Sequence, residues 1–164
     1  MAETTKLRVS KDLAGKIRGH GAETYPHECC GALLGRDGNS DQAQVQPREI
    51  LELFPLLNRR EDSPHNRFSV APQDVLSADK TAQALGLEVI GWYHSHPDHP
   101  AKPSEYDREH AWPWYSYLIV SVEKGAPRQM TSWRLNEDRA GYSQETIEIQ
   151  SAPPDDPESG LERI

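Results

Sequence analysis

Two histidines separated by one residue, at the end of a strand-like stretch, constrain this chain more than any other feature of its sequence. The stretch Gly91-Trp-Tyr-His-Ser-His-Pro follows Val89 and Ile90 and favours β structure until Pro97 ends it. Side chains at positions i and i+2 of a strand leave the same face, so His94 and His96 point one way and the serine between them points the other. Their Cα atoms would lie about 6.6 Å apart. Two imidazoles at that spacing can converge on one metal ion.

Asp107 is the best candidate for a third ligand. Pro103 and Ser104 precede an acidic stretch, and Ser104 has the character of a helix N-cap. Asp107 then lies in the first helical turn, close enough to fold back over the end of the strand. Two histidines and one carboxylate leave a tetrahedral zinc ion with an open position for water, which is typical of a catalytic site. Zinc lowers the pKa of such a water to about 7, and a further carboxylate is needed to move the proton.

The same residues also have a simpler interpretation. A histidine pair at this spacing is more often exposed or hydrogen-bonded than bound to metal. Ser104 and Asp107 fit the Ser-x-x-Asp pattern of a helix cap, in which Asp107 accepts a hydrogen bond from the backbone N–H of Ser104. The two interpretations differ in what Asp107 contacts, the metal or the backbone.

Taken together, the histidine pair with Ser104 and Asp107 at this spacing resembles the metal motif of the JAB/MPN (JAMM) zinc metalloprotease family, prokaryotic type. The resemblance extends from residue 7 to about residue 135. It implies that His94, His96 and Asp107 hold Zn2+. It further implies that the upstream Glu28 is the general acid/base for the zinc-bound water, and that Ser104 helps to stabilise the oxyanion.

The resemblance also implies a fold and an activity. We expect an α/β fold with a curved, mostly antiparallel sheet flanked by helices, similar to cytidine deaminases, and the order of predicted helices and strands fits it. We expect hydrolysis of peptide or isopeptide bonds after the C-terminal Gly-Gly of a ubiquitin-like or sulfur-carrier protein. The alternative is a scaffold of the MPN type that binds a partner protein without catalysis. A zinc nucleobase deaminase would need His-x-Glu and Pro-Cys-x-x-Cys, and the sequence contains neither.

Length and composition restrict the partners and the location. The 164 residues suit a single domain. We assign residues 1–150 to it and interpret the acidic, proline-rich residues 151–164 as a disordered tail. A net charge of −8 argues against nucleic-acid binding through a basic surface. The start has no apolar signal region and no stretch is apolar enough to cross a membrane, so we expect a cytoplasmic protein without a membrane partner. An edge strand or the first helix could pair two copies into a homodimer, although no motif shows it.

Hydrophobic periodicity predicts the other elements. A helix capped by Ser10 runs to about Gly21, and a buried strand covers residues 29–35. A charged loop over 56–65 and a short strand over 68–70 precede a second helix over 72–85. Residues 146–149 form a last edge strand. We expect the second helix to face inward with Val75, Leu76, Ala82 and Leu85.

The cysteines and tryptophans each have an ordinary interpretation. Cys29 and Cys30 are neighbours and fit small core residues at the start of a strand, the alternative being a redox-sensing thiol near the metal. Trp92, Trp112 and Trp114 are expected in the core or in the wall of a pocket.

Overall fold

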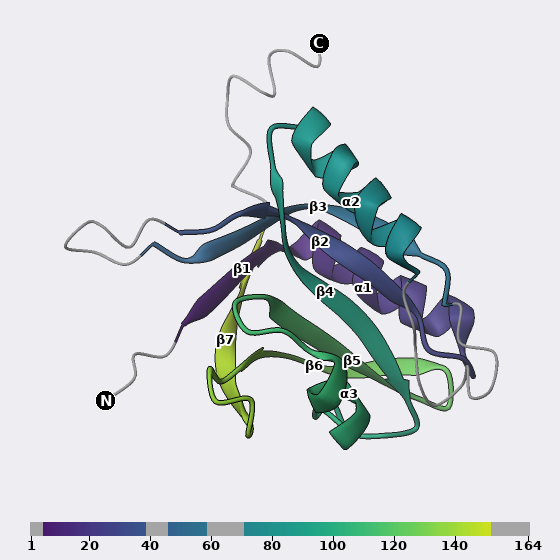
Figure 1. Cartoon of the computed structure of the whole chain (residues 1–164). Helices are drawn as coiled ribbons and strands as arrows, with labels where there is room; N and C mark the ends of the chain where they lie inside the picture. Colours follow the sequence, from purple (N-terminus) through teal and green to yellow (C-terminus); the bar gives the residue numbers. More distant parts are fainter. Residues whose placement is uncertain (1–4, 39–45, 59–70, 152–164) are drawn as a thin grey trace, which may run out of the picture.

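A closed barrel of strands forms the centre of the structure (Figure 1). This computed structural model describes residues 5–38, 46–58 and 71–151. The strands in these ranges are β1 (Lys6–Ser10), β2 (Cys30–Arg36), β3 (Arg48–Leu56), β4 (Glu88–Pro97), β5 (Ser116–Glu123), β6 (Ala126–Leu135) and β7 (Tyr142–Gln150). The helices are α1 (Lys11–Thr24), α2 (Pro72–Ala84) and α3 (Glu105–His110).

The expected curved sheet flanked by helices is present, but it closes into a barrel. The strand order is β1-β3-β2-β4-β5-β6-β7, and β1 pairs in parallel with both β3 and β7. The pairs β2–β3, β2–β4, β5–β6 and β6–β7 are antiparallel, and β4–β5 is parallel. The strand expected over 146–149 is the second half of β7, where residues 146–150 pair with β1, whereas residues 142–145 pair with β6. As a whole, β7 therefore joins two strands of the barrel instead of ending a sheet. Closure satisfies backbone groups that a sheet edge would leave unpaired, and it removes the edge suggested for a dimer.

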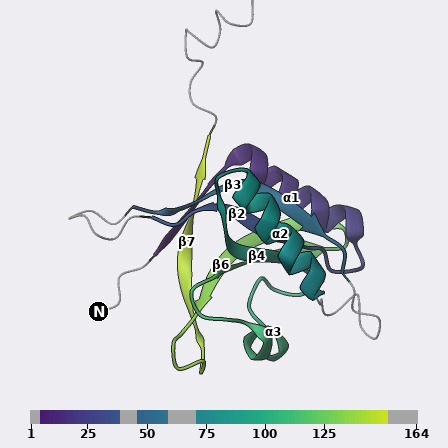
Figure 2. The same ribbon diagram turned by 45° about the horizontal axis from the view of Figure 1, so that its top comes forward.

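Two helices pack on the barrel through two separate hydrophobic clusters, and alternate side chains of β2 divide between them. Leu33 packs with Ile17 of α1 in one cluster, whereas Ala32 and Leu34 pack with Ala82 of α2 in the other. Figures 1 and 2 both show α3 apart from these helices. No helix in the described ranges is both long and apolar enough to span a membrane.

The first helix is longer than its sequence predicts. Ser10 caps it as expected, because its Oγ accepts the backbone N–H of Leu13 at 3.1 Å. Gly21 does not end the helix but lies buried within it. A Cβ atom at Gly21 would lie 2.9 Å from Cγ2 of Val122, so the glycine permits close packing and is not a stop signal.

The inward face expected for α2 is wrong except at Ala82. The buried residues of this helix are Ala78 and Ala82, whereas Val75, Leu76 and Leu85 are 39%, 54% and 51% exposed. These two alanines let α2 lie close to the sheet, against a cluster that includes Leu34, Leu56 and Trp92. The predicted strand over 68–70, most of the loop over 56–65 and most of the tail over 151–164 lie outside the described residues.

Candidate metal centre

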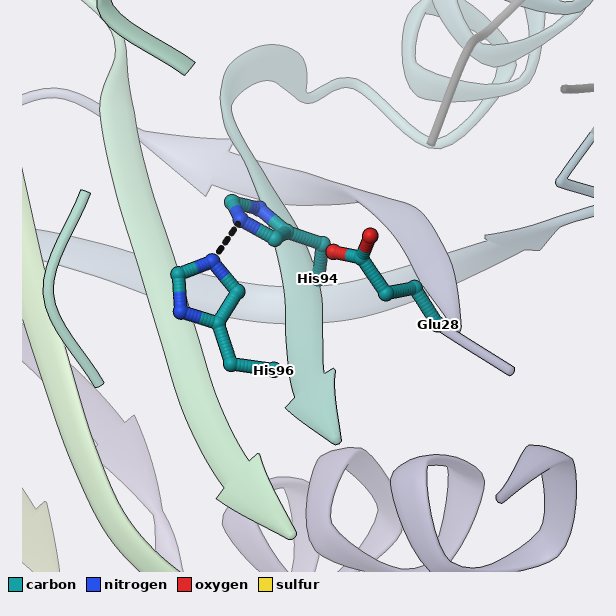
Figure 3. Close-up of side chains that lie close together, drawn as sticks. All are labelled: Glu28, His94 and His96. Atoms are coloured by element: carbon teal, nitrogen blue, oxygen red, sulfur yellow. Dashed lines mark hydrogen bonds between the residues drawn. The ribbon is translucent and has the colours of Figure 1, made fainter. Parts of the chain in front are cut away.

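The end of β4 brings the two histidines together as the strand periodicity predicts. His94 is 1% exposed and His96 is 8% exposed. Their Nε2 atoms lie 3.1 Å apart, and both rings face the same side of the sheet (Figure 3). Ser95 points to the opposite side, where its Oγ accepts the backbone N–H of Cys29 at 2.8 Å.

Asp107 reaches the histidine pair from α3. Its Oδ2 lies 3.2 Å from Nε2 of His96 and 3.4 Å from Nε2 of His94. The same oxygen accepts the backbone N–H of Ser104 at 2.8 Å, while Oγ of Ser104 accepts the N–H of Asp107 at 3.0 Å. The capping interpretation and the metal interpretation are therefore compatible, because the helix cap itself aims the carboxylate at the imidazoles.

Glu28 is the second carboxylate near the pair, and it comes from the segment before β2. Its side chain is 2% exposed and points toward His94 (Figure 3). Glu28, His94 and His96 each offer a potential ligand atom, and these atoms lie within 4.8 Å of one another. Asp107 is thus in direct contact with the imidazoles, and Glu28 stands close beside them.

A backbone carbonyl fixes the orientation of His96. Nδ1 of His96 lies 2.9 Å from the carbonyl oxygen of Pro100. A carbonyl can only accept, so Nδ1 donates and, in the neutral ring, Nε2 carries a lone pair. The loop that carries Pro100 is itself anchored, since the hydroxyl of Tyr25 and the N–H of Lys124 donate to Asp98 at 2.6 and 2.7 Å.

The pKa shifts show how strongly the three groups interact. Burial lowers the pKa of His94. Burial also opposes the charged form of His96, but the hydrogen bond and charge of Asp107 outweigh it and raise the pKa of His96. Burial alone would raise the pKa of Asp107, yet the facing imidazoles hold this pKa far below its usual range. The carboxylate therefore stays ionised despite its burial.

These atoms form a donor set that suits zinc. With both imidazoles neutral, the lone pair of His96 faces Nε2 of His94 and a carboxylate oxygen at hydrogen-bond distances, an arrangement that a cation between them would stabilise. Two imidazole nitrogens and one carboxylate are a known catalytic zinc ligand set, whereas magnesium and calcium prefer oxygen alone.

Ser95 connects β4 to the segment that carries Glu28. In addition to the bond from Cys29 N–H, the backbone N–H of Ser95 donates to the carbonyl of Cys29 at 3.2 Å. Asn58 adds a bond from Nδ2 to the carbonyl of Glu28 at 3.3 Å. The sequence alone did not predict this role, and its one signal was the position of Ser95 opposite the two histidines in the strand alternation.

Both cysteines are free and buried, which confirms their expected place in the core. Burial raises the pKa of the Cys29 thiol to about 11 and that of Cys30 to about 12. The reactive form is the thiolate, so these shifts argue against the redox-sensing alternative.

A cavity opens beside the candidate metal ligands. In the described part of the chain, His94 and Asp107 contribute to its wall, together with residues of α2, α3 and β7. In addition to the imidazoles of His94 and His110, its aromatic rings are Trp92, Tyr106, Trp112, Tyr115, Tyr117 and Tyr142. Trp92 and Trp112 are the pocket-wall tryptophans that the sequence suggests, whereas Trp114 is 43% exposed and lies against the Arg48 guanidinium. The tyrosines were missed, and Tyr106, within the Ser-x-x-Asp motif, was the available signal.

Comparison with known proteins agrees with this geometry. A family model described as prokaryotic homologs of the JAB domain matches residues 10–136. A desampylase from Haloferax volcanii is 32% identical over 125 residues, which cover 73% of this chain and 84% of the relative. A probable TtuB-protein conjugate cleaving protease from Thermus thermophilus is 33% identical over 117 residues, 71% of each chain.

A solved structure extends the match to the fold. The solution structure of a protein from Desulfitobacterium hafniense has a TM-score of 0.75 and 32% sequence identity, and the alignment covers 89% of this chain and 94% of that one. The family match spans the strand with the histidine pair, Glu28 and Asp107. The chain is thus a member of the prokaryotic JAB-domain family.

Proposed function

We propose that this protein is a zinc-dependent hydrolase that cleaves peptide or isopeptide bonds after the C-terminal Gly-Gly of a ubiquitin-like or sulfur-carrier protein. His94, His96 and Asp107 are the proposed zinc ligands. Glu28 is the proposed general acid/base, and Ser104 is the proposed donor to the oxyanion.

One observation carries the proposal: Nε2 of His94, Nε2 of His96 and Oδ2 of Asp107 converge within 3.4 Å of one another. Glu28 also offers a carboxylate oxygen, within 4.8 Å of a ligand nitrogen of each histidine. The contacts of Asp107 with both imidazoles at 3.2 and 3.4 Å support its role as ligand, and Glu28 is then available as the proton carrier.

Bound zinc would supply Lewis-acid activation of a water molecule and of the scissile carbonyl. Glu28 takes the proton of the attacking water and returns it to the leaving amine, so one side chain acts first as base and then as acid. The hydroxyl of Ser104 accepts the N–H of Asp107 through its oxygen, which leaves its hydrogen to donate to the carbonyl oxygen of the substrate.

The names of two relatives support the substrate class. One relative is a desampylase and another is a probable protease that cleaves protein conjugates of TtuB. The alignment covers 84% of the first and 71% of the second. We infer the same kind of reaction here, on a protein that is joined to its partner through its own C-terminus.

Zinc content and turnover test the proposal together. The wild-type chain, supplied with zinc, should bind about one ion per chain, and Asp107→Ala should lose it. Glu109→Ala, on the exposed surface of the same helix, should keep it. Glu28→Gln should retain zinc while the cleavage rate of a Gly-Gly-ended ubiquitin-like protein fused to a reporter peptide falls by about 10²–10⁴-fold.

Two results would contradict the assignment. A wild-type chain without zinc, even after supply of the metal under reducing conditions, would favour the non-catalytic scaffold. Normal turnover by zinc-loaded Glu28→Gln would remove Glu28 from the mechanism.

A further inference from the structure

The aromatic cavity beside the candidate metal ligands has no role in the chemistry described above. Its volume is about 330 Å³, near the lower end of the roughly 300–1,000 Å³ typical of ligand pockets. This size suits one large side chain of a substrate better than an extended cofactor.

The wall of the cavity favours a neutral guest. Asp107 is the carboxylate in this wall, and the two imidazoles and the Ser104 N–H already engage it. The hydroxyl of Tyr117 accepts the backbone N–H of Trp112 at 2.8 Å, and burial raises the pKa of Tyr117 to about 12, so this group stays neutral. The imidazole of His110 also lines the wall, where it stacks on the ring of Tyr106 and its Nδ1 donates to the carbonyl of Tyr106 at 2.8 Å. A cationic side chain would lose its hydration here without gaining an ion-pair partner.

The mouth of the cavity disfavours a cation in particular. The guanidinium of Arg139 lies 5.2 Å from the ring centre of Trp112, and it occupies this ring as a cation–π partner. Trp112 is nevertheless 65% exposed, so much of its apolar surface is open to a guest. Aromatic and long aliphatic side chains are the groups that such rings bind best.

The short helix α3 has no buried residue of its own. Polar contacts hold it, since Arg108 donates to the carbonyl of Arg139 at 3.0 Å and Arg139 donates to the carbonyl of Ala111 at 2.7 Å. Tyr106 of this helix lines the cavity and is adjacent to Asp107. A guest in the cavity would therefore pack against the helix that carries the proposed metal ligand.

The residues at the edge of the cavity indicate which side of the scissile bond it serves. Its described wall includes His94 and Asp107 but neither Glu28 nor His96. In the proposed reaction, Glu28 protonates the leaving amine, so the leaving group lies on the side of Glu28. The cavity is then on the side of the acyl chain. Two glycines have no side chains and span about 7 Å when extended, so the first side chains able to enter come just before them.

We propose that this aromatic pocket binds a large neutral side chain, aromatic or long aliphatic, at the third or fourth residue before the scissile bond. The inference rests on the proposed function for its orientation, since Glu28 defines the leaving side. It adds a selectivity to that function, namely for acyl chains that carry such a residue immediately upstream of Gly-Gly.

Peptide binding to the zinc-loaded full chain tests the pocket without relying on turnover. The probes are octapeptides that end in a free Gly-Gly and carry Phe, Leu, Ala or Lys at the third or the fourth position from the end, measured by isothermal titration calorimetry. At one of the two positions, the Phe and Leu peptides should bind at least about tenfold more tightly than the Ala and Lys peptides.

Variants locate the selectivity in the pocket. Trp112→Ala removes part of the wall and should reduce the ratio between the Phe and Ala peptides to within about twofold. Val75→Trp, which adds bulk to the wall from α2, should reduce the same ratio by filling the space. Leu76→Ala is the matched control, because Leu76 neighbours Val75, is 54% exposed and does not line the cavity; it should preserve the ratio.

The possible results distinguish a failure of the proposed pocket from a failure of the proposed hydrolysis. Equal binding of all peptides at both positions, or tightest binding of the Lys peptide, would overturn the pocket. The same sequences with aminomethylcoumarin after Gly-Gly report hydrolysis, so selective binding without hydrolysis would count against the proposed function alone. Hydrolysis that responds only to the residue after the scissile bond, measured with internally quenched peptides, would place the cavity on the leaving side and contradict the inference.

Discussion

Ser95 shows how one buried side chain can act on a residue far away in the sequence. It lies between the two histidines but faces the other side of β4, and its hydroxyl accepts the N–H of Cys29 at 2.8 Å. Since Cys29 directly follows Glu28, this bond fixes the backbone that carries the proposed general base. The strand alternation thus places the proposed metal ligands His94 and His96 on one face and Ser95 on the other, where it holds the backbone next to the proposed general base.

We predict that Ser95→Ala lowers kcat by roughly 10- to 100-fold, the usual effect of losing a supporting contact at a metal site, while zinc content stays at the wild-type level. The loss of the acceptor leaves the buried N–H of Cys29 unsatisfied, at a cost of about 1–3 kcal/mol in the free energy of unfolding. Ser95→Thr, which keeps the hydroxyl, should restore much of kcat. An unchanged kcat in a folded, zinc-loaded Ser95→Ala enzyme would contradict the positioning role.

Thiol reactivity provides a second check on single residues. The pKa values of about 11 for Cys29 and about 12 for Cys30 mean that neither thiol ionises appreciably at pH 8. We predict slow alkylation by iodoacetamide in the native protein and rapid alkylation of both cysteines in denaturant, followed by mass spectrometry. In the folded protein, both thiols stay protonated at pH values above the ordinary pKa of cysteine. Their contribution to the free energy of unfolding is therefore present below that ordinary pKa and is lost as the pH rises toward 11. Fast native labelling at pH 8 would exclude the buried environment.

Two of the three glycines in the first helix have opposite functions. A Cβ atom at Gly15 would meet no atom within 4 Å, whereas one at Gly21 would lie 2.9 Å from Val122 and 3.3 Å from the Cβ of Ser95. Gly21 therefore sets how closely α1 approaches the strands that hold the site. Gly21 is needed for this close packing, whereas the sequence pattern indicated only the end of a helix.

We predict that Gly15→Ala stabilises the protein by about 0.4–1 kcal/mol, because alanine lowers the entropy of the unfolded chain and favours the helix. Gly21→Ala should destabilise it by about 1–3 kcal/mol through overpacking against β5. Both values come from urea unfolding of the zinc-loaded chain, and each variant is the control for the other. Equal effects of the two substitutions would refute the packing role of Gly21.

The whole barrel depends on strands at the two ends of the described chain. The family match covers residues 10–136, yet β1 begins before it and β7 follows it. β7 joins β6 to β1 and carries the buried Glu145, which accepts hydrogen bonds from Ser132 at 2.7 Å and from Arg134 at 2.9 Å. These pairings enclose Leu7 and Val9, which are fully buried on β1.

We predict that a chain ending at residue 136 loses cooperative thermal unfolding and binds a dye for exposed apolar surface, because β1 and β6 each lose a partner strand. A chain ending at Ser151 retains every described strand and should keep the Tm of the full-length protein within about 2 °C. The second truncation also tests the expectation that the domain ends near residue 150. A stable, cooperative chain ending at 136 would show that closure by β7 is dispensable.

The features that the sequence predicted correctly are local ones. The alternation of a strand placed His94 and His96 on one face, Ser104 and Ser10 marked two helix starts, and these results hold because each depends on neighbours within a few residues. The resemblance carried by the motif also led to the correct family. Periodicity could not decide which face of α2 turns inward, because that depends on the size of the side chains in the sheet below it.

The tertiary structure alone decided how distant segments meet. Ser95 and Cys29 are 66 residues apart in the chain, and their contact exists because β2 and β4 are antiparallel neighbours. Barrel closure and the gathering of tyrosines from α3, β5 and β7 around one cavity follow in the same way from strand order. A local pattern specifies the direction of a side chain relative to its own backbone, and only the packing of the elements specifies what that side chain meets.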